Sequence, residues 1–217
     1  MKPTSTRTEA ALLLIPSAAL LLVARFKWAP IDFTEACGFV TGAVCVWLVT
    51  RGNIWNWPIG LVNNLFFAVL FWRARLFADM GLQGVYFALG IWGWWHWLRG
   101  GKNHSRLEVT RSTRGEWIGI ALFLAFGTWG LRELLIAVNG AAPFWDSLTT
   151  TLCLAAQYLL CRKRIENWWL WITADIIYVP LYFSRHLPLT AILYAGFIGL
   201  CVIGLLRWRK ELHAHRL

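Results

Sequence analysis

The stretch IENWWLWITADIIYVPLY, residues 165–182, decides the fold. It is too apolar for the surface helix of a soluble protein, yet it carries one carboxylate near its middle. A charged group at the centre of a bilayer costs about 2.5 to 3.5 kcal/mol on insertion scales, so it normally faces a cavity or a partner. At helical spacing, one face collects five side chains: Trp168, Trp171, Asp175, Tyr178 and Tyr182. We expect this face to line a ligand-binding cavity.

The composition predicts an integral membrane protein. Hydrophobic residues make up 58% of the 217 positions, charged residues only 15%, and there are 16 tryptophans, which is too much apolar surface for one soluble core. A formal charge of +10 would suggest a nucleic-acid partner in a soluble domain. Here the basic residues fall in short connections between apolar runs, which is typical of membrane orientation, so we expect lipid and not nucleic acid around the chain.

The cysteines and the missing motifs exclude several classes of protein. None of the five cysteines forms a CxxC pair, and all lie in or at the ends of apolar runs, so we interpret them as small core residues. The sequence has no phosphate-binding loop, no HExxH and no GxSxG. We therefore predict no metal, no cofactor and no catalytic residues. Chains of buried acids for proton coupling are also missing, which favours a passive carrier.

Eight apolar runs predict eight membrane-spanning helices, and several are shorter than the usual ~20 residues. They cover residues 10–26, 34–50, 55–72, 80–98, 117–138, 147–161, 168–183 and 188–206. The first run resembles the apolar core of a signal peptide, but no convincing cleavage site follows it, so we treat it as an extra helix. Arg132 and Glu133, close to the end of the fifth run, are expected to pair near the membrane interface.

The distribution of basic residues predicts the orientation. With eight spans, one side receives both termini and fifteen Lys and Arg residues, whereas the other side receives six. The excess marks the cytoplasmic side, so we expect both termini in the cytoplasm. A seven-span alternative without the first run leaves the rest of this orientation unchanged.

The chain contains a weak internal repeat at a shift of 111 residues. This shift places Asn56 on Asn167, Asn64 on Asp175 and Phe67 on Tyr178. It predicts two parallel three-helix repeats, a known transporter plan in which the ligand binds between the repeats near the middle of the membrane. We divide the chain into an extra helix (1–33), a first repeat (34–100), a cytoplasmic linker with a connecting span (101–144), and a second repeat with a cytoplasmic tail (145–217).

The predicted cavity combines aromatic and polar side chains from both repeats. Its expected members are Asn64, Gln83, Gln157, Trp168, Trp171, Asp175 and Tyr178. For Asp175 the alternative is a structural hydrogen bond to a neighbouring helix, and the amides could likewise only bridge helices. Most of the tryptophans are expected to form a belt at the membrane interface. Aromatic rings with one carboxylate suit a flat cationic ring that carries hydroxyl groups, such as a nucleoside.

Two segments resemble a known family. Residues 55–100, which begin WNWPIG, and residues 166–212, which contain the pattern WxxAD at Trp171 to Asp175, look like the PnuC nicotinamide riboside transporters of bacteria. The resemblance implies a SWEET-like arrangement of three, one and three helices plus the N-terminal one. It further implies a homotrimer in the bacterial inner membrane. Nicotinamide riboside would cross by facilitated diffusion and alternating access, and phosphorylation by a cytosolic kinase would trap it.

Three alternatives stay open at this stage. Related members carry thiamine or riboflavin, so the identity of the vitamin rests on similarity. A substrate-binding subunit of an energised importer would need a partner to transport. A membrane-embedded enzyme would need a catalytic base or metal cluster, for which Asp175 alone is a poor substitute.

Overall fold

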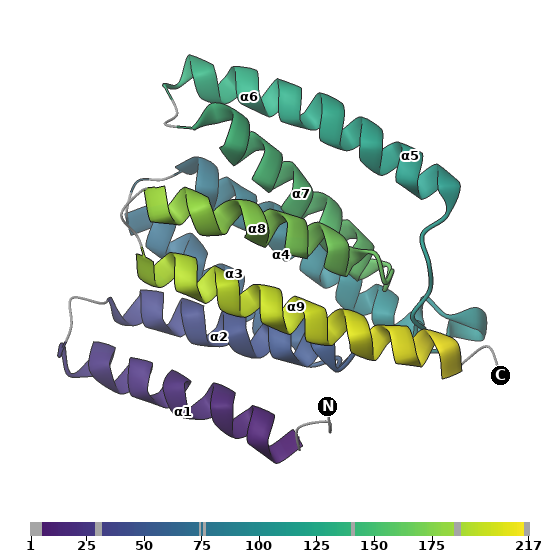
Figure 1. Ribbon diagram of the computed structural model, residues 1–217, viewed down its shortest axis with the longest axis horizontal. Coiled ribbons are helices and arrows are strands. Elements are labelled where there is room, and N and C mark those ends of the chain that lie inside the picture. Colours follow the sequence, from purple (N-terminus) through teal and green to yellow (C-terminus); the bar gives the residue numbers. More distant parts are fainter. Residues whose placement is uncertain are drawn as a thin grey trace. The chain divides into compact units, whose positions relative to one another are not determined.

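The structure, a computed structural model, describes residues 6–28, 32–73, 75, 77–139, 142–184 and 188–214. In these ranges there is no β-strand, and an isolated parallel bridge joins Thr110 to Arg164. The helices (Figure 1) are α1 (Thr6–Arg25), α2 (Phe33–Thr50), α3 (Asn56–Arg73), α4 (Phe77–Arg99), η1 (Lys102–His104), α5 (Arg114–Leu122), η2 (Phe123–Gly127), α6 (Thr128–Ala137), α7 (Pro143–Cys161), α8 (Asn167–Ser184) and α9 (Pro188–Ala214). The predicted all-α class is confirmed, and each apolar run matches a helix to within a few residues, apart from a longer α9.

The chain forms two compact units. The first comprises Met1–Val49 and Asn53–Ile91, and the second comprises Thr50–Gly52 and Trp92–Leu217. The division therefore falls inside α4, and the short turn after α2 belongs with the second unit. The four segments expected from the sequence, 1–33, 34–100, 101–144 and 145–217, stay a prediction.

Two of the described helices are long and apolar enough to cross a membrane by length and composition. They are α2 and the continuous helix Arg114–Ala137, of which only 11% of the apolar window is buried. A helix that exposes so much apolar surface needs an apolar environment. The eight spans and the cytoplasmic termini stay predictions, and residues 1–5 and 215–217 lie outside the described ranges.

Local capping explains where α2 begins. The Asp32 carboxylate accepts hydrogen bonds from the backbone N–H groups of Thr34 (2.8 Å) and Glu35 (3.3 Å), as expected for an N-cap residue. Slight desolvation alone would raise the pKa of Asp32, but these hydrogen bonds outweigh it, and the pKa lies below its ordinary value of 3.8. Within the same unit, Asn63 Nδ2 donates to the carbonyl oxygen of Gly38 (2.6 Å), which joins α3 to α2.

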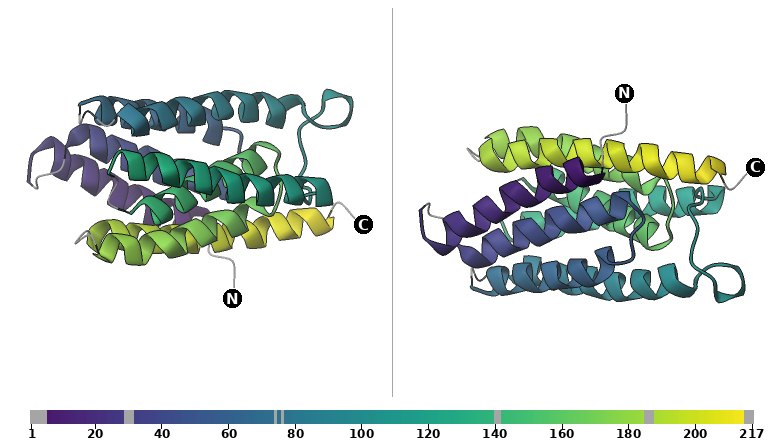
Figure 2. Two further views of the ribbon diagram at one scale, coloured as in Figure 1. Left: turned by 90° about the horizontal axis from the view of Figure 1, so that it is seen from above. Right: turned by 90° about the horizontal axis from the view of Figure 1, so that it is seen from below.

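The second unit is organised around α7. Helices α5, η2 and α6 run on as one helix, which packs against α7; α7 packs against α8, and α8 against α9 (Figure 2). The π-helical turn η2 faces this contact, where a Cβ on Gly127 would lie 3.2 Å from Thr151 Cγ2. One residue further on, the hydroxyl groups of Thr128 and Thr151 are 2.7 Å apart. Small and hydroxyl-bearing residues therefore allow the two helices to approach closely.

The turns before α3 and α8 share one hydrogen-bonding pattern. Asn53 N donates to Leu48 O (3.0 Å), and Arg164 N donates to Leu159 O (2.9 Å), at the same shift of 111 residues as the sequence repeat. The side chains of Asn56 and Asn167 each donate to the carbonyl oxygen three residues earlier, at 2.7 and 2.6 Å. In both turns the residue before the first of these donors has positive φ: Gly52 at 59° and Lys163 at 51°. The local backbone is thus repeated.

The linker after α4 is folded onto the second unit. Thr110 N donates to Lys163 O (3.2 Å), and Ile165 N donates to Thr110 O (3.0 Å). The Glu166 carboxylate accepts from both the backbone N–H and the hydroxyl of Ser112, at 2.9 and 3.0 Å. This polar connection is therefore attached to the turn between α7 and α8 by main-chain and side-chain hydrogen bonds.

Candidate functional site

Asp175 is the buried acid of α8. Its exposed fraction is 5%, and the Cys201 thiol of α9 donates to its Oδ2 over 3.8 Å. Ala174 beside it and Ala191 of α9 are fully buried. A thiol is a weak donor, so this single contact compensates only part of the loss of hydration. The side chain is therefore suited to receiving a stronger donor or a cation.

Tyr178 lies one turn along the same helix, between α7 and α9. Its hydroxyl is 3.9 Å from the Cys153 sulfur of α7, and its ring lies 4.8 Å from that of Tyr194, at an interplanar angle of 44°. Tyr194 in turn makes an edge contact with Phe197 at 5.7 Å. These aromatic contacts extend the predicted face of α8 onto α9.

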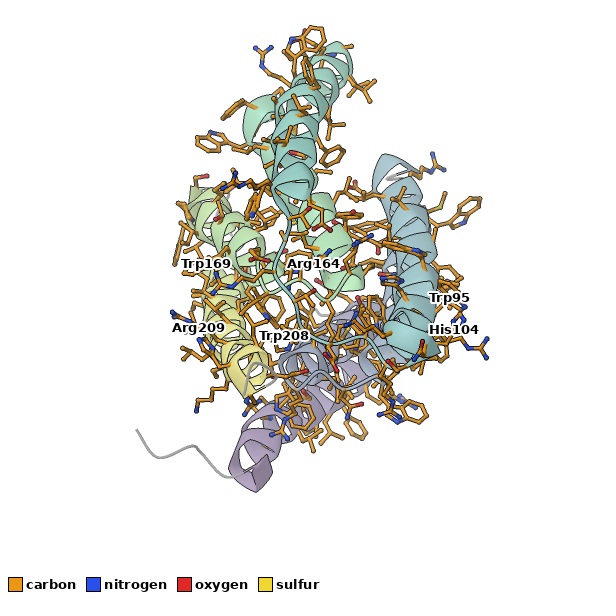
Figure 3. All side chains as sticks on the ribbon, turned by 90° about the vertical axis from the view of Figure 1, so that its right-hand side faces the viewer. Trp95, His104, Arg164, Trp169, Trp208 and Arg209 are labelled. Atoms are coloured by element: carbon orange, nitrogen blue, oxygen red, sulfur yellow. The ribbon has the colours of Figure 1, made fainter. Side chains whose placement is uncertain are left out.

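Trp168 is fixed more tightly than a ligand-contacting residue needs to be. Only 1% of it is exposed, and its ring makes an edge contact with Trp208 at 5.4 Å. The ring occupies the space that a side chain at Gly204 would fill, because a Cβ there would lie 2.4 Å from the indole. Its Nε1 has no hydrogen-bond partner among the described residues. The neighbouring Trp169 is 55% exposed, on the outer side of α8 (Figure 3).

The α8 face is thus brought together, although it is covered on two sides. Trp168, Asp175 and Tyr178 all contact α9, and Tyr178 also approaches α7. Trp171 of α8 and Gln157 of α7 are half-buried in the same unit, and the side chain of Tyr182 lies outside the described residues. Asn64 of α3 and Gln83 of α4 are half-buried in the first unit. Their position opposite Asp175 stays a prediction.

The structure adds three neighbours that sequence reasoning did not place in the site: Cys153, Tyr194 and Cys201. The cysteines were interpreted as small core residues, and only contacts between helices reveal that they adjoin Tyr178 and Asp175. For Tyr194 a signal existed, since the repeat places it on Gln83, which was itself predicted to line the cavity.

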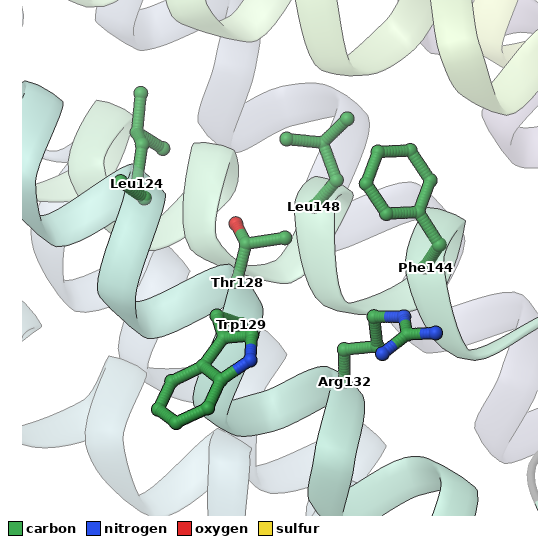
Figure 4. A pocket seen from close by; sticks show the side chains of 7 residues that line it. Leu124, Thr128, Trp129, Arg132, Phe144 and Leu148 are labelled. Atoms are coloured by element: carbon green, nitrogen blue, oxygen red, sulfur yellow. The ribbon is translucent and has the colours of Figure 1, made fainter.

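A separate cavity lies away from these residues. It has a volume of about 550 Å³ and opens between the continuous helix and α7 (Figure 4). Its lining is largely apolar, with Trp129 and Arg132 on one side and Phe144 and Leu148 on the other. Arg132 pairs with Glu133 as expected, so its charge is neutralised. Because this cavity offers little polar chemistry, we place the candidate site at the α8 face.

Metal binding finds no support at this face. In the described ranges there is no group of three or more His, Cys, Asp or Glu side chains that could hold a metal ion. The same residues include five cysteines, all free thiols.

A tightly packed helical protein with a buried carboxylate and aromatic rings between its helices fits a membrane transporter, and family comparison identifies the class. The family model for the nicotinamide mononucleotide transporter matches residues 32–210. The chain therefore belongs to this transporter family. The resemblance expected from the WNWPIG and WxxAD patterns is confirmed.

Individual relatives narrow the comparison. The chain is 28% identical over 178 residues to the nicotinamide riboside transporter PnuC of Escherichia coli, covering 70% of this chain and 74% of the relative. It is 27% identical over 186 residues to the riboflavin/roseoflavin transporter RibM of Streptomyces davaonensis, covering 82% and 85%. A solved structure, the crystal structure of the Vitamin B3 transporter PnuC, superposes with a TM-score of 0.74 and 26% identity, covering 97% of this chain and 94% of that one.

Proposed function

We propose that the chain is a nicotinamide riboside uniporter that works by facilitated diffusion and alternating access. The single observation that carries this proposal is the buried Asp175 among aromatic side chains, in a chain whose relatives include nicotinamide riboside transporters. The pyridinium ring of the riboside is flat and positively charged. Rings stack on it, and a carboxylate in a water-poor site attracts its charge.

The charge of the α8 face favours a riboside over a mononucleotide. Between Asn167 and Ser184 the helix has no Lys or Arg, and its only ionisable acid is Asp175. A phosphate group would need cationic or N–H donors, and a carboxylate would repel it. We therefore expect the mononucleotide named by the family description to bind more weakly than the riboside.

Riboflavin is the second candidate, because one relative of similar identity carries it. The isoalloxazine ring is flat but neutral, so it would use the aromatic side chains and gain little from Asp175. Thiamine, which is cationic, would use both. A binding panel can separate these ligands.

The experiment is titration calorimetry on detergent-purified protein with nicotinamide riboside, nicotinamide mononucleotide, riboflavin and thiamine. The proposal expects the riboside to bind at least tenfold more tightly than the others. Tightest binding of riboflavin or thiamine would move the chain to another specificity within the family. No binding of any of the four would contradict the vitamin-transport proposal.

The arrangement of the chain in the membrane is part of the same proposal. Two parallel three-helix repeats joined by Arg114–Ala137, with α1 as an extra helix, are supported by the repeated turns before α3 and α8. We infer location in the bacterial inner membrane with both termini in the cytoplasm, and a homotrimer. Reporter fusions at each terminus test the orientation, and native mass spectrometry tests the trimer.

Uptake by a uniporter stops when the two concentrations are equal, so net import needs removal of the product. We infer a cytosolic kinase that phosphorylates the riboside, because the added charge would keep it from leaving through a face suited to a cation. Cells that lack the kinase should still equilibrate the riboside but not accumulate it. Accumulation without phosphorylation would point instead to an energised importer.

A further inference from the structure

Lys163 is a buried cation in the turn between α7 and α8. The residue is 8% exposed, and its ammonium group has three kinds of partner. It donates to the Leu107 carbonyl oxygen of the linker (3.1 Å) and to Glu211 of α9 (3.3 Å), and it lies 5.1 Å from the ring centroid of Trp97 in α4. A lysine is almost never buried without such compensation. We call Lys163, Glu211, Trp97 and Leu107 the Lys163 cluster.

The backbone at this position indicates that the side chain matters. Lys163 has φ of 51°, a left-handed conformation that strains a residue with a Cβ and suits glycine. The equivalent position in the other turn, Gly52, is a glycine with φ of 59°. A lysine in the same backbone conformation is therefore retained at a conformational cost. The contacts of its ammonium group offer the physical compensation.

The cluster joins parts of both predicted repeats. A Cβ on Gly52 would lie 3.8 Å from Lys163 Nζ, and Arg207 of α9 donates to the Thr50 hydroxyl over 3.1 Å. Trp97 and Trp208, which are equivalent at the shift of 111 residues, contact each other at 5.9 Å between ring centroids. Trp97 Nε1 also donates to Leu160 O at 2.9 Å. Thus the ends of α2, α4, α7 and α9 meet here, at the end predicted to face the cytoplasm.

Trp208 links this cluster to the candidate site. It contacts Trp97 at one edge and Trp168 of the α8 face at another, and it points into the unit while Arg209 points away (Figure 3). Polar contacts between exposed side chains would be screened, but this lysine is removed from water. Contacts of this kind can hold one conformation of a two-state element in preference to the other.

We propose that the Lys163 cluster is a clasp that closes the cytoplasmic end of the transport pathway and opens when substrate is released to the cytosol. The inference rests on the proposed transport function, since alternating access requires the two repeats to separate at one end at a time. The bonds from Lys163 span segments of both repeats, so separation at this end must break them.

Cys161 provides a reporter within the chain. It is fully buried, two residues before Lys163, and is a free thiol. In a variant with the other four cysteines changed to serine or alanine, the rate of maleimide labelling of purified protein reports how often this end opens. Lys163→Met removes the charge and keeps most of the side-chain volume, and Glu211→Gln removes the partner. Lys210→Met, at an exposed position of the same helix, is the matched control.

We expect Lys163→Met and Glu211→Gln each to raise the labelling rate of Cys161 about tenfold, with the control unchanged. A second reporter that keeps only Cys153, which is buried within α7, should be labelled no faster in either variant. Unchanged labelling of Cys161 overturns the proposal. Faster labelling of both reporters also overturns it, because it would show general loosening. Since labelling needs no vitamin, the clasp can stand even where none of the tested vitamins binds.

Discussion

The turn before α3 and the turn before α8 have the same backbone but different side chains. Both repeat one pattern of main-chain and asparagine hydrogen bonds, and both contain a residue with positive φ. At that residue the first turn has Gly52 and the second has the buried Lys163. Seven residues or more into the helices, Asn64 and Phe67 in α3 correspond to Asp175 and Tyr178 in α8. The scaffold is repeated, whereas charge and hydroxyl groups are concentrated in the second copy.

This difference explains why a repeat protein can hold an asymmetric ligand. Capping and turn geometry depend on a few local hydrogen bonds, which two copies can share. Recognition depends on side chains that need not match, and a cation with a hydroxylated sugar presents different chemistry on its different sides. The following experiments test how far the two copies are equivalent.

The largest effect is expected where α9 approaches α8 most closely. Gly204→Ala would place a Cβ 2.4 Å from the Trp168 ring, and such overpacking typically costs about 1–3 kcal/mol. Thermal unfolding of purified protein should show a clearly lower midpoint. Gly199→Ala on the same helix, where a Cβ would meet no atom within 4 Å, is the control and should leave the midpoint unchanged. Equal midpoints for both variants would show that Trp168 is not confined by α9.

The next effect concerns the carboxylate that the first copy lacks. Asp175→Asn keeps the size of the side chain but removes its charge, so the dissociation constant for nicotinamide riboside should rise about tenfold, or ~1.4 kcal/mol. Asn64→Ala, which removes the amide at the equivalent position, should raise it less. Calorimetry measures both values, with gel filtration to verify folding. An unchanged affinity in Asp175→Asn would remove this residue from the site.

A smaller effect should be shared by the two turns. Asn56→Ala and Asn167→Ala each remove one hydrogen bond to a turn carbonyl, worth about 1 kcal/mol. Because the geometry is repeated, the two variants should lower the unfolding midpoint by similar amounts. A loss in only one of them would indicate that the resemblance between the turns does not extend to their energetics.

The smallest effect is that of the cap at the start of α2. The pKa of Asp32 is lower in the folded protein than its ordinary value of 3.8. Its stabilising contribution is therefore complete above that value and is lost as the pH falls through the lower folded value. The difference in stability between wild type and Asp32→Asn should be constant above about pH 5 and shrink below pH 4. A constant difference down to pH 3 would contradict the role of the carboxylate.

Periodicity predicted the helices well and the contacts between them poorly. Runs of apolar residues locate α7 and α8, and the spacing of Trp168, Asp175 and Tyr178 predicts their common face. Helical spacing cannot show which neighbour covers a face, so the contacts with Trp208, Cys201 and Tyr194 emerge only from the packing. For Trp168 the structure gives a tightly packed ring, where an accessible one was expected.

The linker illustrates another limit of sequence reasoning. Its glycines and basic residues are typical of a solvated connection, and the sequence offered no sign that Thr110, Ser112 and Leu107 bond to the turn before α8. Those partners lie some fifty residues apart in the chain. The charge of Lys163 was counted only as evidence of orientation, because burial of a single lysine depends on its tertiary neighbours.

The most direct test of the account is uptake of radiolabelled nicotinamide riboside into liposomes that contain only this protein. The account predicts saturable uptake that stops when the inner and outer concentrations are equal, needs no ion gradient or nucleotide, and falls in Asp175→Asn. Uptake that required a second protein or an ion gradient would contradict facilitated diffusion. Uptake of riboflavin in place of the riboside would contradict the proposed specificity.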